Sequence, residues 1–421
     1  MVLFSLAWHS LKNRKLTTGL TVVSIALSVA LLMGVEHVRI GARDSFSNTI
    51  SQTDLIVGAR GGSLQLLLYS VFHIGSATNN VSYQSYEHFR NHPAVEWTIP
   101  YSLGDSHRGF RVVGTTEDFY SHFRYRRDHK IEFSEGHLPD GLFDVVLGSD
   151  VASTLKYKIG DPIVVTHGIT EGRGLLQHDD KPFHVAGILT RTATPVDRSL
   201  YVSLYGIEAM HMDWEDGGPP LPGEETPASR IKKEDLKVKQ TTAFLLRAKS
   251  RIDTLRLQRE ISTFEDEPLM AIIPGVALGE LWNTIGYAEE ALTLVTFFVL
   301  LVGLLGMLVS LYTSLNERRR EMAILRALGA GPRKIIFLLA LESFLLSLAG
   351  TVLGIAVVYG GALLAQPIIE RRFGLFIPIT APTPTGYVYL GTVIVAGLLI
   401  GFVPAVKAYR NALADGLSIR V

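Results

Sequence analysis

The chain has 421 residues, and its 40 basic side chains balance its 40 acidic ones. A balanced charge gives no electrostatic attraction to nucleic acid, so no nucleic-acid partner is implied. The sequence contains no cysteine, which excludes disulfides, thiol catalysis and cysteine-ligated metal sites. Hydrophobic residues make up 47% of the chain, and because they gather in long blocks they indicate membrane spans.

The first apolar block follows a short basic segment. Residues 1–15 mix apolar and basic side chains, which predicts an amphipathic helix at the cytoplasmic interface with Trp8 as its anchor. Residues 16–35 predict the first transmembrane helix. A cleaved signal peptide is the competing interpretation. The length of the run, and the lack of a small-x-small cleavage site at 33–37, favour a retained membrane helix.

Residues 36–290 contain no second run of spanning length and predict a folded extracytoplasmic domain. Its two ends, 36–48 and 278–287, predict helical extensions of the neighbouring spans, which would form a rigid stalk. Between them, β-branched runs alternate with helical segments, so we expect a mixed α/β fold. The predicted strands are 110–114, 144–148, 162–166, 183–189 and 241–247, and the predicted helices are 81–93, 151–156 and 250–263.

Three further transmembrane helices are predicted after this domain. Residues 291–315 carry no charge and residues 335–364 carry only Glu342, and each run exceeds the roughly 20 apolar residues that cross a bilayer as a helix. The connection between them is basic, which places it in the cytoplasm by the positive-inside rule. The remaining segments are the cytoplasmic loop 316–334, the outer loop 365–386, the fourth span 387–406 and the tail 407–421, with both termini cytoplasmic.

The cytoplasmic loop 316–334, called the coupling loop below, has the pattern of a short amphipathic helix. Ile324, Leu325 and Leu328 fall on one helical face among charged residues. Gly329 suits a helix C-cap, and Pro332 suits the first turn of the next helix. We therefore predict that a partner protein binds here. The contact residues that we assign are Glu317, Arg318, Arg319, Glu321, Ile324, Leu325, Arg326, Leu328 and Gly329.

Glu342 is the one charged residue in the four predicted spans. An intramembrane carboxylate indicates a functional site by default, such as a transport or proton-relay group. Glu342 lies only about two helical turns beyond the coupling loop, so we favour a structural hydrogen bond between helices. Small residues farther along this span favour close helix packing over a pore, and they are Gly350, Gly354, Gly360 and Gly361.

Motifs for nucleotide chemistry are missing from the sequence. It has no G-x-x-x-x-G-K-[ST] loop, no G-x-G-x-x-G that opens a helix after a strand, and neither H-E-x-x-H nor G-x-S-x-G. We therefore predict that the chain is not an enzyme and holds no cofactor of its own. If it performs work, another chain supplies the energy.

Histidine is the one residue type that points to metal chemistry. Eleven of the thirteen histidines lie from His73 to His211, inside the predicted outer domain. His88 and His92 have the i, i+4 spacing that zinc uses on a helix, and His178 and His184 stand on a predicted strand-turn-strand. Surface histidines without a metal are the competing interpretation, and we favour it, so these four residues are weak metal candidates.

The sequence resembles the FtsX/MacB-type permeases. The coupling-loop stretch ERRREMAILRALGAGPRKI, then Glu342, then the tail VPAVKAYRNALADGL occur in the order found in that family, as in its LolC/LolE-like members. In the outer segment, VVGTTEDFY, VVLGSDVASTLKYKIGDPIVV and FHVAGILTRTATPVDRSLYV resemble the family's periplasmic core domain. Residues 214–230, rich in Pro and Gly, have no counterpart there.

The resemblance implies a membrane subunit of a mechanotransmission (type VII) ABC transporter in a bacterial inner membrane. It implies four transmembrane helices with a large mixed α/β periplasmic domain, and a dimer of identical or different permease chains. It also implies a separate ABC-type ATPase that binds ATP and Mg. In such complexes residues 317–329 form a coupling helix in a groove of the ATPase, and ATPase closure moves the stalks and the outer domains.

Two functions remain open at this stage. The complex could use ATP to transport or extract an envelope substrate, such as a lipoprotein, a peptide or a small molecule. Alternatively, it could transmit ATPase-driven motion to a periplasmic partner, such as an envelope enzyme or sensor, with nothing transported. A system linked to metal through the outer histidines is a third hypothesis.

Overall fold

The computed structural model describes residues 2–168, 178–214, 226–317, 330–373, 377 and 379–414. The chain divides into two compact units. The helical unit comprises Met1–Gly41, Ile285–Pro367 and Ile377–Val421. The sheet unit comprises Ala42–Thr284 and Ile368–Phe376.

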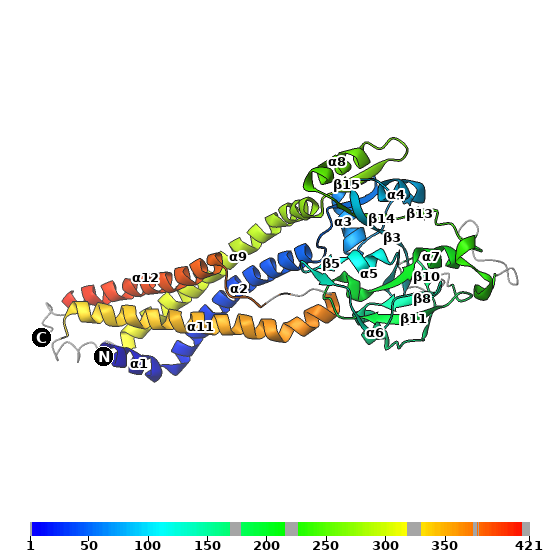
Figure 1. The fold of residues 1–421 in the computed structure, drawn as a ribbon. Helices are drawn as coiled ribbons and strands as arrows, with labels where there is room; N and C mark the ends of the chain where they lie inside the picture. The colour runs from blue at the N-terminus through cyan, green and yellow to red at the C-terminus, as the bar shows by residue number, and fades with distance from the viewer. Residues whose placement is uncertain are drawn as a thin grey trace, which may run out of the picture. The chain divides into compact units, whose positions relative to one another are not determined.

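The helical unit contains a short first helix and parts of four long ones (Figure 1). All four long helices are long and apolar enough to cross a membrane, so the fold class predicted from the sequence is confirmed. The predicted outward extensions of the first two spans are also helical, because α2 and α9 continue through them without a break. The helices are α1 (Val2–Asn13), α2 (Lys15–Asn48), α9 (Pro274–Glu317), α11 (Pro332–Phe373) and α12 (Pro384–Ala414).

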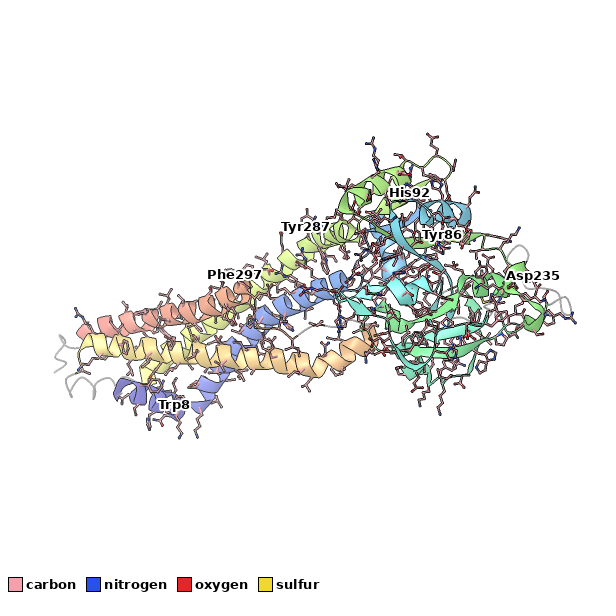
Figure 2. The ribbon with its side chains drawn as sticks, in the orientation of Figure 1. Trp8, Tyr86, His92, Asp235, Tyr287 and Phe297 are labelled. Carbon is pink, nitrogen blue, oxygen red and sulfur yellow. The ribbon has the colours of Figure 1, made fainter. Side chains whose placement is uncertain are left out.

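Large apolar side chains cover the outside of this unit. Phe297, Phe298 and Val302 of α9 are each more than half exposed, and Figure 2 labels Phe297 on that helix. Exposure of such an apolar surface to water is unfavourable in free energy, whereas lipid tails solvate it. Trp8 on α1 is 58% exposed (Figure 2), which suits the interfacial position predicted for it.

Glycines let α11 approach α2 closely. A Cβ atom added at Gly350 would lie 2.6 Å from Ile25 Cγ2, and one added at Gly354 would lie 2.7 Å from Val29 Cβ. These distances leave no room for a side chain, so the packing role predicted for both glycines is confirmed. Around Gly360 and Gly361, by contrast, no described atom comes within 4 Å of an added Cβ.

Small residues also face each other between α11 and α12, which lie side by side (Figure 1). Gly397 of α12 packs against Ser347 of α11, and Gly401 packs against Ser343. Because lipid offers no hydrophobic force to join helices, such close backbone contacts are a main source of association. The centre of α11 therefore packs closely against α2 on one side and against α12 on the other.

The sheet unit is built on an 11-stranded mixed sheet in the order β15-β1-β14-β3-β4-β12-β8-β11-β7, with β10 beside β3 and β9 beside β11. The pairs β4–β12 and β8–β11 are parallel. Two small antiparallel pairs, β2–β13 and β5–β6, form separate two-stranded sheets. The strands are β1 (Leu55–Ala59), β2 (Val81–Ser82), β3 (Val95–His107), β4 (Phe110–Thr115), β5 (Arg124–Tyr125), β6 (His129–Lys130), β7 (Phe133–Gly136), β8 (Asp144–Leu147), β9 (Pro162–Ile163), β10 (Thr166–His167), β11 (Phe183–Leu189), β12 (Ser199–Ser203), β13 (Gln240–Thr241), β14 (Ala243–Ala248) and β15 (Leu269–Ile272).

Helices pack on both faces of the sheet, and alternate strand residues point to opposite faces. On β14, Leu245 joins the core that contains α3 and α5, whereas Phe244 and Leu246 join the core that contains α4 and α8. On β12, Tyr201 joins the first core, and Leu200 joins a third core that contains α6 and α7. The helices are α3 (Ser63–Val71), α4 (Tyr83–Arg90), α5 (Asp118–His122), α6 (Ser149–Leu155), α7 (Leu204–Met210) and α8 (Arg251–Ser262), with short 3-10 turns η1 (Pro195–Arg198), η3 (Ala228–Arg230) and η4 (Lys233–Asp235).

Asp197 holds the turn that leads into β12. Its side chain is fully buried, and its carboxylate accepts hydrogen bonds from the backbone N–H and the hydroxyl of Thr192, each at 2.8 Å, and from the N–H of Ala193 at 2.6 Å. Ala193 has a φ of +52°, a conformation that non-glycine residues rarely adopt. The three hydrogen bonds stabilise this strained turn.

We expect Asp197→Ala to lower the melting temperature of the purified chain by several degrees. The change leaves the buried backbone N–H groups of Thr192 and Ala193 without their acceptor, and each unsatisfied group costs about 1–3 kcal/mol. The measurement is a thermal melt in detergent. Asp140→Ala is the matched control, because that side chain is 85% exposed and its loss is expected to change stability by less than about 0.5 kcal/mol. Equal melting temperatures for the two variants would contradict this role for Asp197.

Candidate functional site

The coupling loop connects two of the long helices. Its residues 318–329, which include most of the predicted contact residues, lie outside the described part of the chain. Glu317 ends α9, and its side chain is not described either. On the other side, Pro332 begins α11, as predicted for a proline in a first helical turn. The predicted contact surface therefore joins directly onto helices at both ends.

Glu342 is fully buried in the helical unit. It is followed on α11 by buried hydroxyl groups, in which Ser343 donates to the carbonyl of Ala340 at 2.9 Å and Ser347 donates to the carbonyl of Ser343 at 2.9 Å. Ser347 Oγ also lies 3.7 Å from the sulfur of Met307 on α9. A polar stripe of Glu342, Ser343 and Ser347 thus runs along the buried side of α11, and its contact between Ser347 and Met307 reaches α9.

Helices α2 and α9 are linked by polar contacts. Thr21 donates to Ser310 Oγ at 3.0 Å, and Ser28 donates to the carbonyl of Val299 at 3.3 Å. Nearer the end of the helical unit, Arg39 forms two 3.0 Å hydrogen bonds with Glu36 on its own helix and lies 3.6 Å from Glu289 of α9. Contacts spread along both helices favour their movement as a pair.

Three of the four weak metal candidates lie at two separate places, near α8 and on β11. His88 packs against the rings of Phe89 and Phe264. His92 lies beside α8 (Figure 2), with Nε2 3.5 Å from a carboxylate oxygen of Glu260. His184 is an exposed residue of β11. The i, i+4 pair therefore does not form part of a group of three or more potential ligands in the described structure.

The fourth candidate, His178, lies in a group that the sequence did not predict. Its partners are Asp105, His167 and His211, and the four potential ligand atoms all lie within 4.8 Å of one another; we call this group the histidine cluster. Burial, and next the neighbouring His211, lowers the pKa of His178 to about 4, so its ring is neutral at physiological pH. A hydrogen bond with Asp105 raises the pKa of His167.

Family models match both parts of the chain. The model described as MacB-like periplasmic core domain matches residues 18–263, more than half of the chain. The model described as FtsX-like permease C-terminal matches residues 293–413. Four apolar helices and a large mixed-sheet domain thus define a membrane protein with a large periplasmic domain. The chain belongs to the family of FtsX-like permeases with a MacB-like periplasmic core domain.

Individual relatives match over shorter stretches. The uncharacterized ABC transporter permease YknZ of Bacillus subtilis is 36% identical over 111 residues, 26% of each chain. The macrolide export ATP-binding/permease protein MacB of Photorhabdus laumondii is 34% identical over 119 residues, 28% of this chain and 18% of the relative. The pyoverdine export ATP-binding/permease protein PvdT of Pseudomonas entomophila is 36% identical over 114 residues, 26% of this chain and 16% of the relative. The alignments thus span only about a quarter or less of these proteins.

One solved structure is similar to the larger part of the chain. The crystal structure of the periplasmic region of MacB from Actinobacillus actinomycetemcomitans has a TM-score of 0.34 and 11% sequence identity. The match covers 56% of this chain and 95% of that one. The family assignment does not depend on it, because the family models match the sequence itself.

Proposed function

We propose that this chain is the permease subunit of an ABC transporter that uses a separate cytoplasmic ATPase to move its periplasmic domain. Two of its relatives carry ATP-binding and permease parts in one protein by their names, whereas this sequence has no nucleotide-binding loop. An ATPase that binds ATP and Mg is therefore expected as a second subunit, and a second permease chain as a third.

The observation that carries this proposal is the continuity of α9. This helix begins at Pro274, in the sheet unit, and ends at Glu317, where the coupling loop begins. Its 44 residues give a length of about 66 Å at 1.5 Å per residue, enough to cross a bilayer core of about 30 Å and extend beyond it. A displacement at the coupling loop is thereby passed along one hydrogen-bonded rod.

The substrate of the proposed transporter is a separate question. Export of a small molecule is favoured by relatives named for macrolide and pyoverdine export. Extraction of a lipoprotein or peptide would use the same helix, α9, and so would transmission of motion to a periplasmic enzyme or sensor. Purification of the tagged chain in mild detergent, with bound proteins identified by mass spectrometry, tests the proposal. An ATPase at about one copy per permease supports it, and the absence of any ATPase even after crosslinking contradicts it.

The proposed orientation in the membrane can be tested because the chain has no native cysteine. We expect a membrane-impermeant maleimide to label Asp140→Cys, in the sheet unit, in spheroplasts. Gly331→Cys, an exposed position within the coupling loop, is expected to react only after lysis. Labelling of Gly331→Cys in intact spheroplasts would refute a cytoplasmic coupling loop.

A further inference from the structure

The histidine cluster draws its members from four separate segments of the sheet unit. Asp105 lies near the end of β3, and His167 on β10. His178 precedes β11, and His211 is the C-cap of α7. A group of four potential ligands from segments so distant in sequence is not a product of local charge patterning.

The backbone places two of these residues opposite each other. His167 is the register partner of Asp105 in the antiparallel pairing of β10 with β3, and directly opposite residues point to the same face of a sheet. The pairing of β3 with β4 shifts between Leu103 and Ser106, which is the kind of irregularity that re-aims a side chain next to a site. The N–H of His178 donates to the carbonyl of Val165 at 2.9 Å, which places this residue beside β10.

The spacing of the potential ligand atoms fits a small cation. His167 Nδ1 lies 3.1 Å from Asp105 Oδ1 and 3.2 Å from His211 Nε2, and the latter two atoms are 3.9 Å apart. Tetrahedral zinc, with bonds of about 2.0–2.2 Å, places its ligand atoms about 3.3–3.6 Å from one another. All four potential ligand atoms lie within 4.8 Å, so inward shifts of about 1.5 Å or less, within the range of side-chain rotations, complete the shell.

A backbone carbonyl fixes the ring of His211. Its Nδ1 lies 2.9 Å from the carbonyl oxygen of Ile207, and because a carbonyl only accepts, Nδ1 carries the hydrogen. The lone pair is then on Nε2, the atom that faces His167 and Asp105. Metal-binding histidines are oriented in this way by a hydrogen bond from the other ring nitrogen.

His178 lacks the partners that a buried ring needs. It is fully buried, and neither of its ring nitrogens has a hydrogen-bond partner among the described residues. Buried polar atoms are nearly always paired, and an ion is one explanation for an exception. Trp214 packs on it with a ring-centroid distance of 4.0 Å, whereas the side chain of His167 is 48% exposed and gives an ion access from solvent.

An ionic contact holds two of the four segments together. Lys181 is fully buried, and its Nζ lies 2.8 Å from Asp180 Oδ2 and 2.6 Å from Asp213 Oδ2. Asp213 also accepts hydrogen bonds from the backbone and hydroxyl of Thr226. The residues that follow His178 and His211 are thus joined independently of the cluster itself, which pre-organises those two ligands.

We propose that the histidine cluster binds one divalent transition-metal ion, with zinc as the best fit. Three imidazoles and one carboxylate are suited to such ions, whereas Mg²⁺ and Ca²⁺ prefer oxygen ligands. Four protein ligands fill a tetrahedral shell and leave no open position for catalysis. The ion therefore ties β3, β10 and the end of α7 together, and this inference does not rest on the proposed transport function.

The test uses the full chain in detergent, stripped with a chelator and then titrated with zinc. We expect binding of one equivalent per chain, a melting temperature raised by several degrees, and, with Co²⁺ in its place, the intense visible absorption of a tetrahedral site. His167→Ala and His211→Ala are expected to weaken zinc binding by about 100-fold or more. His88→Ala and His184→Ala, outside the cluster, are the matched controls and are expected to bind zinc as the unchanged chain does.

Three results would overturn the proposal. The first is no saturable zinc at one equivalent, and the second is equal loss of binding in the control variants. The third is binding of Ca²⁺ or Mg²⁺ with an affinity similar to that for zinc. His178→Ala is a poor first variant, because removal of a fully buried ring also lowers stability. The exposed His167 avoids that ambiguity.

Discussion

Leu325→Asp combined with Leu328→Asp is expected to abolish co-purification of the ATPase while the chain stays in the membrane. Each of these leucines contributes about 1.5–3 kcal/mol when buried against a partner. Loss of two such contacts, about 3–6 kcal/mol, weakens binding by 10² or more, since 1.4 kcal/mol is a factor of ten. The measurement is the ratio of ATPase to permease after purification in mild detergent.

The control for this variant has the same spacing and the same chemical change at another place. Ile252 and Leu255 of α8 are 82% and 63% exposed, and they are three residues apart, as Leu325 and Leu328 are. Ile252→Asp with Leu255→Asp adds two charges to the sheet unit and is expected to leave ATPase binding intact. Retention of the ATPase by the coupling-loop variant would disprove the assignment of the docking face.

The membrane helices could be predicted from the sequence because their signal is local. The apolar composition of a run of about 20 residues is by itself enough to indicate a transmembrane helix. All four candidate spans were therefore predicted. Some strands also have a local sequence signal. Residues 183–189 form β11 with the predicted bounds. The predicted strand 162–166 is wrong as one strand, because its two ends pair with different partners, β9 with β11 and β10 with β3.

The predicted strands 110–114, 144–148 and 241–247 also correspond to β4, β8 and β14. Strand β3 shows why other strands of the sheet were not predicted. Its 13 residues include Pro100 and Gly104, residues that usually end or interrupt a strand. The strand persists because β14 and β4 pair with it on either side, and this support comes from distant parts of the chain.

The histidine cluster was missed for a similar reason. His178 was a candidate because it stands with His184 on a predicted strand-turn-strand, but its partners come from segments whose proximity is set by strand register and by the end of α7. For the partners of His178, the sequence offered only the general excess of histidine in the outer domain.

Gly354→Leu is expected to lower the melting temperature of the detergent-solubilised chain by several degrees and to reduce its yield. An added Cβ would lie 2.7 Å from Val29 Cβ and 2.8 Å from the carbonyl oxygen of Ala26, and this carbonyl belongs to the helix backbone. The clash is relieved only if α2 and α11 separate, and overpacking of this kind costs about 1–3 kcal/mol or more. Separation also breaks the close backbone contacts that join helices in lipid.

Gly360→Leu is the matched control, because the same substitution falls on the same helix. No described atom lies within 4 Å of a Cβ at this position, and leucine favours a helix over glycine by up to about 1 kcal/mol. We therefore expect its melting temperature to be unchanged or slightly raised. If both variants lose stability equally, the cause is the loss of glycine from α11 rather than its contact with α2. If only Gly354→Leu is unstable, close contact between these two helices is required, and α11 is then fixed to α2 about two helical turns beyond Ser347, the last residue of the polar stripe.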